Sequence, residues 1–245
     1  MRSIARLRGP AAYLYLSVSL SATVLSAVPS ATASASAPRA ARNPSFKLSD
    51  WTPASRGTID ARVFSLALDA ASCAVRSGAV DGPSTLSVID YSRPSTSPRL
   101  WVFDLESREL LYEELVAHGQ GSGGNLATQF SNTEDSHQSS LGLFVTEGTY
   151  VGRNGYSLRL NGLDRGFNDR ARERAIVVHG APYVDAKLAL AQGRLGRSWG
   201  CPALREAVAR DLIDRVKGGS LVFAYYPDPL WLASSAYLGG CRAAA

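Results

Sequence analysis

The sequence predicts a mixed, β-rich (α+β) domain with a few short helices, preceded by an N-terminal helix. Three observations support this prediction: short apolar runs of strand length recur along the chain, helical patterns are few, and no regular β-α-β alternation connects them. The 245 residues are 45% hydrophobic, which suits one domain with a full hydrophobic core.

The first 37 residues have the order of a secretory signal peptide. Three arginines lie within the first eight residues, residues 11–28 are apolar, and small residues follow, with cleavage expected after Ala33, Ala35 or Ala37. An uncleaved membrane anchor is the alternative, because the apolar stretch is almost long enough to span a bilayer. We expect an exported, soluble mature protein in the periplasm or cell envelope.

Much of the formal charge of +5 lies in this N-terminal segment. Its removal lowers Lys plus Arg from 26 to 23 against 21 acidic residues, which leaves about +2. A net charge this small gives no indication of nucleic-acid binding. Five arginines flank the candidate site described below and suit an anionic substrate, with solvated loop charge as the alternative: Arg170, Arg172, Arg174, Arg194 and Arg197.

Residues 38–57, rich in Pro, Ser and Arg, are expected to form a flexible lead-in to a single domain over residues 58–245. Apolar residues at helical spacing predict a helix over residues 63–75, and further helices over 183–192 and 204–216. Apolar runs bounded by turn residues predict the strands. These are expected over residues 86–91, 100–105, 109–117, 141–150, 156–160, 175–179 and 220–226.

The chain has three cysteines, an odd number that leaves at least one thiol unpaired in an exported protein. Cys73 and Cys241 are the candidates for a disulfide that attaches the C-terminal tail to the first helix. The alternative is that Cys73 is simply a small buried residue. We expect Cys201 to be free, because the glycine turn around it is shaped to expose the backbone. A structural cysteine needs no such turn.

Cys201 and His179 are the candidate catalytic pair. His179 ends a buried apolar strand, and Cys201 lies between Gly200 and Pro202. A thiol and an imidazole held by two rigid elements are the minimum set for covalent acyl transfer. The alternative for His179 is a hydrogen-bonded structural histidine.

The turn before Cys201 consists of Ser198, Trp199 and Gly200, and Pro202 suits the first position of a helix. Cys201 is therefore expected at a helix N-terminus, where free N–H groups and the helix dipole stabilise a thiolate. These N–H groups, with that of Gly200 or Cys201, suit the oxyanion of a tetrahedral intermediate.

Several other residues are candidates for substrate binding. Gly180 leaves room beside the imidazole, and Arg197 supplies a positive charge near the thiol. His118 and His137 are rivals of His179 as the base, and either suits substrate binding or a loop-capping hydrogen bond. The histidines lie far apart and no cysteines are closely paired, so we expect no metal and no organic cofactor.

Several motifs in one order resemble the murein L,D-transpeptidase catalytic domain family, over about residues 60–226. His179-Gly180 followed by Ser198-Trp199-Gly200-Cys201 is similar to the signature of L,D-transpeptidases. The wider pattern is SVIDYSRPS (87–95), RLWVFDL (99–105), VAHGQGSG (116–123), SNTEDSHQSSLG (131–142), GYSLRLNGLD (155–164), RAIVVHGA (174–181) and GRLGRSWGCPAL (193–204). The resemblance implies a β-sandwich or barrel with a few short helices.

The resemblance also implies an activity. Cys201 would attack the L-centre carbonyl of the third, diamino-acid residue in a peptidoglycan tetrapeptide stem, and D-alanine would leave, protonated by His179. The thioester would pass to an amine of another stem, to a lysine of a wall-attached protein, or to water. Carbapenem-type β-lactams would acylate the same thiol.

The sequence also departs from the family pattern. Most L,D-transpeptidases place a histidine before the Gly-Cys pair and an Arg or Asn soon after it, where this chain has Trp199 and Pro202-Ala203. Two other classes therefore stay open: an exported cysteine peptidase or amidase, including an L,D-carboxypeptidase, and a non-catalytic wall-binding protein.

Overall fold

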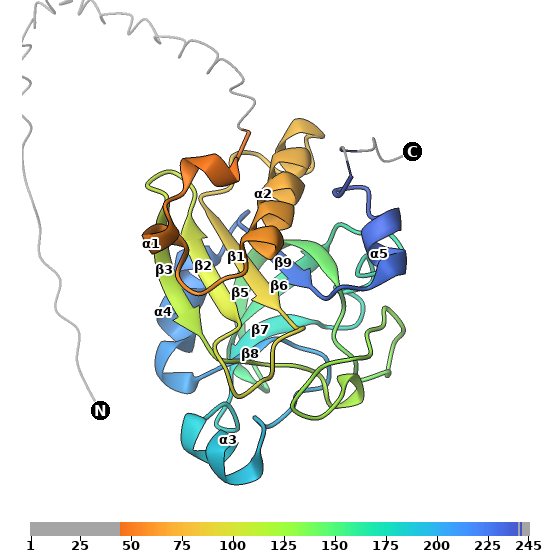
Figure 1. Cartoon of the computed structure of the whole chain (residues 1–245). Helices are drawn as coiled ribbons and strands as arrows, with labels where there is room; N and C mark the ends of the chain where they lie inside the picture. Colours follow the sequence, from red (N-terminus) through yellow and green to blue (C-terminus); the bar gives the residue numbers. More distant parts are fainter. Residues whose placement is uncertain (1–44, 240, 242–245) are drawn as a thin grey trace, which may run out of the picture. The chain divides into compact units, whose positions relative to one another are not determined.

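The computed structural model describes residues 45–239 and 241, so the predicted signal peptide over residues 1–37 lies outside the described residues. Within them, nine strands form one mixed sheet in the order β3-β2-β1-β9-β5-β6-β7-β8-β4 (Figure 1). The strands are β1 (Thr85–Asp90), β2 (Leu100–Asp104), β3 (Glu109–Glu114), β4 (Val116–Ala117), β5 (Gly142–Gly152), β6 (Gly155–Gly162), β7 (Val177–Gly180), β8 (Ala203–Leu204) and β9 (Leu221–Tyr225). The β-rich, mixed fold expected from the sequence is confirmed.

The sheet curls into a nearly closed barrel. β3 and β4 lie at the two ends of the strand order, yet only Leu115 separates them along the chain. Because one residue spans only about 3.5 Å, the two edges of the sheet must lie close together. β1 pairs with β9 in parallel, as β7 does with β8, and the other neighbours are antiparallel.

Short helices cover the sheet. They are η1 (Leu48–Asp50), α1 (Pro53–Arg56), α2 (Ala61–Arg76), η2 (Gln120–Ser122), α3 (Ala186–Gln192), α4 (Glu206–Val216) and α5 (Pro229–Ser234). α2 packs against the adjacent strands β1 and β9, whereas α4 contacts both β1 and the pair β6 and β7, and β9 and β5 lie between β1 and this pair in the strand order. α4 therefore lies on the concave face of the curled sheet, with Leu212 and Ile213 buried against it.

The helix predicted over residues 63–75 is α2, and Asp60 explains where it begins. The Asp60 side chain accepts hydrogen bonds from the N–H groups of Arg62 and Val63, which are unpaired at a helix start. Asp185 caps α3 in the same way, so that this helix begins at Ala186 rather than at residue 183.

One predicted strand and one predicted helix have wrong bounds. The strand expected over residues 109–117 is interrupted at Leu115 and continues as β4 at the other edge of the sheet. The helix expected over residues 204–216 begins only at Glu206, because Ala203 and Leu204 pair with β7 and β4 as strand β8. A tertiary pairing has overridden the helical pattern there.

The flexible lead-in expected over residues 38–57 is wrong for residues 45–57, which fold onto the domain as η1 and α1. Trp51 is buried, and its ring packs edge-on against Phe64 and Phe103 at centroid distances of 5.0 and 5.3 Å. Burial of an indole ring against two phenylalanines outweighs the loop-like composition of this segment. In the described part of the chain, no helix combines the length and the apolarity that a membrane crossing needs.

Candidate active site

Cys201 and His179 line one cavity of about 520 Å³. Its walls come from the β5–β6 turn, the segment after β7, the turn before Cys201 and the start of α4. The lining residues are Arg153, Asn154, Gly155, His179, Gly180, Ala181, Pro182, Tyr183, Arg197, Ser198, Trp199, Cys201 and Glu206.

The pairing of β7 with β8 brings the thiol and the imidazole together. The parallel register places Ala203 beside His179, so Cys201, two residues earlier, lies at the level of Val177. The N–H of Val177 donates to the Cys201 Sγ at 3.5 Å, in agreement with this register. Side chains two residues apart lie on the same side of a strand. The His179 side chain therefore follows that of Val177, the residue whose N–H contacts the sulfur.

His179 is held in one tautomer by a hydrogen bond. Its Nδ1 lies 2.9 Å from the backbone oxygen of Gly180, a carbonyl that only accepts, so the proton is assigned to Nδ1 and Nε2 keeps its lone pair. Burial lowers the pKa of His179, while the bond to Gly180 raises it. The imidazole is therefore neutral near pH 7.

Cys201 is free and only 8% exposed. Burial raises the pKa of the Cys201 thiol, while the Val177 N–H and the charge of Arg174 lower it. The thiol is placed to donate to the Ala175 oxygen at 3.7 Å. Ala175 has φ of 52°, a left-handed conformation that costs an L-residue of order 1 kcal/mol or more.

The turn before Cys201 is closed by Ser198. Its hydroxyl donates to the Cys201 oxygen at 2.6 Å and accepts from the Gly200 N–H at 3.1 Å. Gly200 has φ of 114°, and a Cβ there would lie 2.7 Å from the backbone oxygen of Gln138. Only glycine fits this position, because both the backbone conformation and the close contact exclude a side chain.

One expectation about the surroundings of the pair is wrong. Cys201 does not lie at a helix N-terminus, since strand β8 separates it from α4. Gly180 lines the cavity beside His179, and it also allows α4 to pack closely, because a Cβ there would lie 2.9 Å from the Cβ of Ala209.

His118 lies away from the cavity. It is fully buried, and its Nδ1 lies 2.7 Å from an Nη2 of the buried Arg99. Because the guanidinium can only donate, Nδ1 accepts and Nε2 faces the Gly123 oxygen at 3.4 Å. Burial, and then the charge of Arg99, lower the pKa of His118 to about 4, so this histidine is neutral and part of the core.

His137 reaches the cavity only through Trp199. The two rings are stacked, with centroids 4.9 Å apart and planes 10° from parallel. Trp199 is 62% exposed and lines the cavity, and the guanidinium of Arg153 lies 5.8 Å from its ring. His137 therefore does not line the cavity itself but packs against the Trp199 indole that does.

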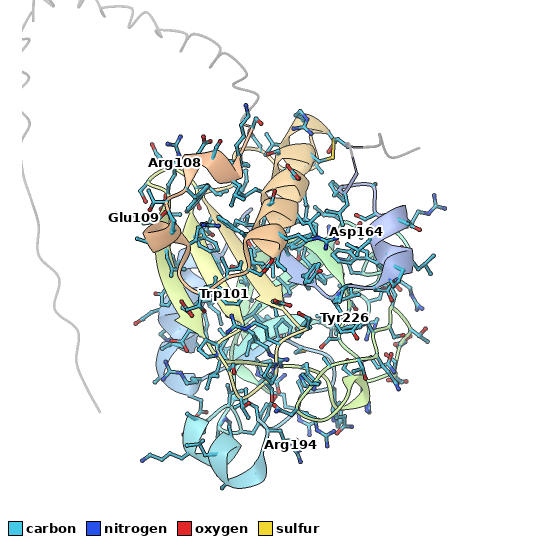
Figure 2. The ribbon with its side chains drawn as sticks, in the orientation of Figure 1. Trp101, Arg108, Glu109, Asp164, Arg194 and Tyr226 are labelled. Atoms are coloured by element: carbon cyan, nitrogen blue, oxygen red, sulfur yellow. A yellow bond between two sulfur atoms is a disulfide. The ribbon has the colours of Figure 1, made fainter. Side chains whose placement is uncertain are left out.

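The arginines that flank the site in sequence have different places in the structure. Arg197 lines the cavity and donates to the Gly123 oxygen at 2.9 Å. Arg194 lies in the loop after α3 (Figure 2) and is not among the lining residues. Sequence reasoning missed Arg153, Tyr183 and Glu206 of the lining, since no local pattern marks them and only the fold places them there.

Cys73 and Cys241 form a disulfide across 168 positions of the chain. The bond joins α2 to the C-terminal segment, on elements that do not line the cavity. Cys201 is thus the one free cysteine of the three.

The chain matches one family model and is similar to several solved structures. The family model described as L,D-transpeptidase catalytic domain matches residues 55–225, and no curated protein sequence gives a significant match. Among similar solved structures are L,D-transpeptidases from Mycobacterium smegmatis (16% identity, TM-score 0.37, 59% of this chain and 60% of that chain) and Stackebrandtia nassauensis (16%, 0.34, 67% and 68%). Another is the helical cell shape determining protein Pgp2 from Campylobacter jejuni (15%, 0.42, 61% and 49%).

This chain thus spans 60% of the Mycobacterium smegmatis structure and about half of the Campylobacter jejuni one. The family model, by contrast, covers well over half of this chain and includes both residues of the candidate pair. The chain belongs to the L,D-transpeptidase catalytic domain family.

Proposed function

We propose that this protein is an exported peptidoglycan L,D-transpeptidase in which Cys201 is the nucleophile and His179 the general base and acid. One observation carries the proposal: a free thiol and an imidazole with an available Nε2 line the same cavity. Family membership and the secretory pattern of residues 1–37 support the substrate and the compartment.

The proposed reaction has two acyl transfers. His179 Nε2 takes the proton of the Cys201 thiol, and the sulfur attacks the L-centre carbonyl of the third stem residue. The C–N bond to D-alanine breaks, and His179 returns the proton to the leaving amine. An amine of a second stem, a lysine of a wall-attached protein, or water then attacks the thioester and gives a proton to His179. The C–S bond breaks, and His179 returns that proton to the sulfur.

The Cys201 N–H is available as a backbone donor for the oxyanion of the tetrahedral intermediate. The Gly200 N–H is already bonded to the Ser198 hydroxyl, whereas the Cys201 N–H has no acceptor among the residues that the structure describes. We therefore assign this role to Cys201 rather than to Gly200 or to helix N–H groups.

The charges of the cavity suit a stem peptide. Arg153 and Glu206 line it from two different elements, and neither forms an ion pair with any other described residue. A stem with free carboxylates and the amine of a diamino acid offers partners for both. Trp199 adds a flat apolar surface beside them.

Mass spectrometry of the products from a disaccharide-tetrapeptide tests the proposal. The mature protein, with its disulfide intact, is incubated with this substrate alone and with an added amine acceptor. We expect loss of D-alanine with a 3–3 cross-linked dimer, and no product with the Cys201→Ala variant. Tripeptide alone, unchanged by acceptor, would instead identify an L,D-carboxypeptidase, and absence of any product would favour a wall-binding protein. Equal turnover by Cys201→Ala would overturn the proposed mechanism.

Carbapenem acylation gives a second readout of the same thiol. We expect a carbapenem to add its mass to the wild-type protein and leave Cys201→Ala unmodified. Because this reaction needs no stem peptide, it separates an inactive thiol from a wrong choice of substrate.

A further inference from the structure

Arg174 lies directly before the segment that contacts the nucleophile, and its two Nη atoms form four hydrogen bonds. Nη1 donates to the Ser131 oxygen at 2.7 Å and to the Ser140 hydroxyl at 2.5 Å. Nη2 donates to the Gln138 oxygen at 2.8 Å and to the Ser136 hydroxyl at 3.2 Å. All four acceptors belong to the loop over residues 131–140, so one side chain fixes this loop from end to end.

The same loop supports the turn that carries Cys201. The Gln138 oxygen packs against Gly200, where a Cβ would lie 2.7 Å away. The Ser139 hydroxyl donates to the Gly200 oxygen at 3.2 Å and accepts from the Gly119 N–H at 3.0 Å. Movement of the loop would therefore move the backbone on which the nucleophile sits.

The acceptors of Arg174 are all neutral, so its charge is not cancelled. No carboxylate among the described residues forms an ion pair with it, although five other arginine or lysine side chains have such partners: Arg170, Arg172, Arg205, Arg215 and Lys217. A half-buried cation without a paired anion acts more strongly on nearby groups than an exposed one, because the effective dielectric constant around it is lower. Its electrostatic effect on Cys201 favours the thiolate.

The other titratable groups around the sulfur carry no comparable charge. Burial raises the pKa of Tyr91, and raises that of Tyr183 to about 12, so both phenols are neutral. Burial lowers the pKa of His179, which is also neutral at pH 7. The charged side chains across the cavity are partly or fully exposed, where solvent screens them: Arg153, Arg197 and Glu206.

We propose that Arg174 is a positioning residue of this active site, which holds the 131–140 loop against the Cys201 turn and supplies an uncompensated positive charge that favours the thiolate. The inference rests on the proposed role of Cys201 as nucleophile. It gives the nucleophile a source of activation in place of the helix N-terminus that the fold does not provide.

Alkylation of the oxidised protein by iodoacetamide, followed as a function of pH, tests this inference without a peptidoglycan substrate. Because Cys73 and Cys241 are bonded, the adduct forms on Cys201 alone. We expect Arg174→Met to shift the alkylation profile to higher pH and to slow the reaction at pH 7 about tenfold, which corresponds to one pKa unit. Arg174→Lys, which keeps the charge, should restore most of the rate. Arg172→Met is the matched control, since Arg172 is exposed and pairs with Glu147.

A second variant separates charge from bracing. Ser136→Asp places a carboxylate on the guanidinium at a position that already accepts its hydrogen bond, so the loop stays braced while the charge is cancelled. We expect it to shift the alkylation profile in the same direction as Arg174→Met, and Ser136→Ala to leave the profile unchanged. If Arg174→Met does not fold, Ser136→Asp decides alone. A wild-type profile in Ser136→Asp, or in a folded Arg174→Met, would overturn the inference, whether or not the protein acts on peptidoglycan.

Discussion

The backbone N–H of Val177 donates to the Sγ of Cys201 at 3.5 Å, and this contact joins the strand of His179 to the turn of Cys201. An N–H donor stabilises a thiolate where burial opposes one. At rest, however, burial raises the pKa of Cys201 and lowers that of His179, so both groups are neutral. For the proposed mechanism, these two directions favour proton transfer within the pair during the reaction over a standing ion pair.

His179 should control the acid side of the pH profile. The neutral imidazole is the active form, and its pKa lies below the ordinary value near 6.5, so kcat/KM should rise with pH through a midpoint below 6.5. His179→Gln should lower kcat/KM by about 10²-fold or more and remove this acid limb. The measurement is kcat/KM on a disaccharide-tetrapeptide between pH 4 and 8, with circular dichroism as the control for folding. Survival of the acid limb in His179→Gln would assign it to another group.

His118 should make the fold sensitive to acid. Its pKa is about 4 in the folded protein and near 6.5 when unfolded, so the unfolded state binds the proton first as pH falls. The stability from His118 is complete above pH 6.5 and is lost progressively toward pH 4, by about 3 kcal/mol. Urea unfolding at several pH values should show that His118→Asn, which keeps an acceptor for Arg99, loses less stability over this range. Parallel curves for the two proteins would contradict the assignment.

Gly180 should be required for the packing of α4 rather than for substrate access. Gly180→Ala would place two Cβ atoms 2.9 Å apart, and we expect a loss of about 1–3 kcal/mol in the free energy of unfolding. Ala209→Gly removes the facing Cβ and should recover part of this loss in the double variant, although a helical glycine itself costs about 1 kcal/mol. Thermal or urea unfolding of the four proteins checks the cycle. Strictly additive effects would show that the two residues do not meet.

The Cys73–Cys241 disulfide should stabilise the fold without taking part in the chemistry. It closes a long loop of 168 positions, and its removal in the Cys73→Ala, Cys241→Ala double variant should cost about 2–4 kcal/mol. kcat/KM at 25 °C should match the wild type, because neither residue lines the cavity. A lower kcat/KM in a fully folded double variant would mean that the C-terminal segment influences the site.

Arg153 and Glu206 should contribute to substrate affinity rather than to the chemical step. Arg153→Gln and Glu206→Gln should each raise KM about three- to tenfold, with little change in kcat, because each removes one charged partner of the stem. The matched control is a stem whose carboxylates are amidated, on which the Arg153→Gln effect should vanish. An equal effect on both stems would assign Arg153 to the support of Trp199 instead.

The sequence by itself determined much of this protein. The strands, the helix α2 and the two chemical groups of the site follow from local patterns: apolar runs mark β1, β2, β5, β6, β7 and β9, and the glycine turn marks Cys201. Local patterns carry this information because side-chain periodicity and turn geometry depend on residues a few positions apart.

Tertiary structure alone decided the surroundings of the pair. Strand β8 takes up Leu204, the expected start of a helix, because β7 and β4 offer this strand backbone partners from distant parts of the chain. His118 is buried where Arg99 binds it, and the Arg174 side chain is fixed by four acceptors of the 131–140 loop. Such contacts join residues that are far apart in sequence, and their burial and charge depend on neighbours that no local pattern specifies.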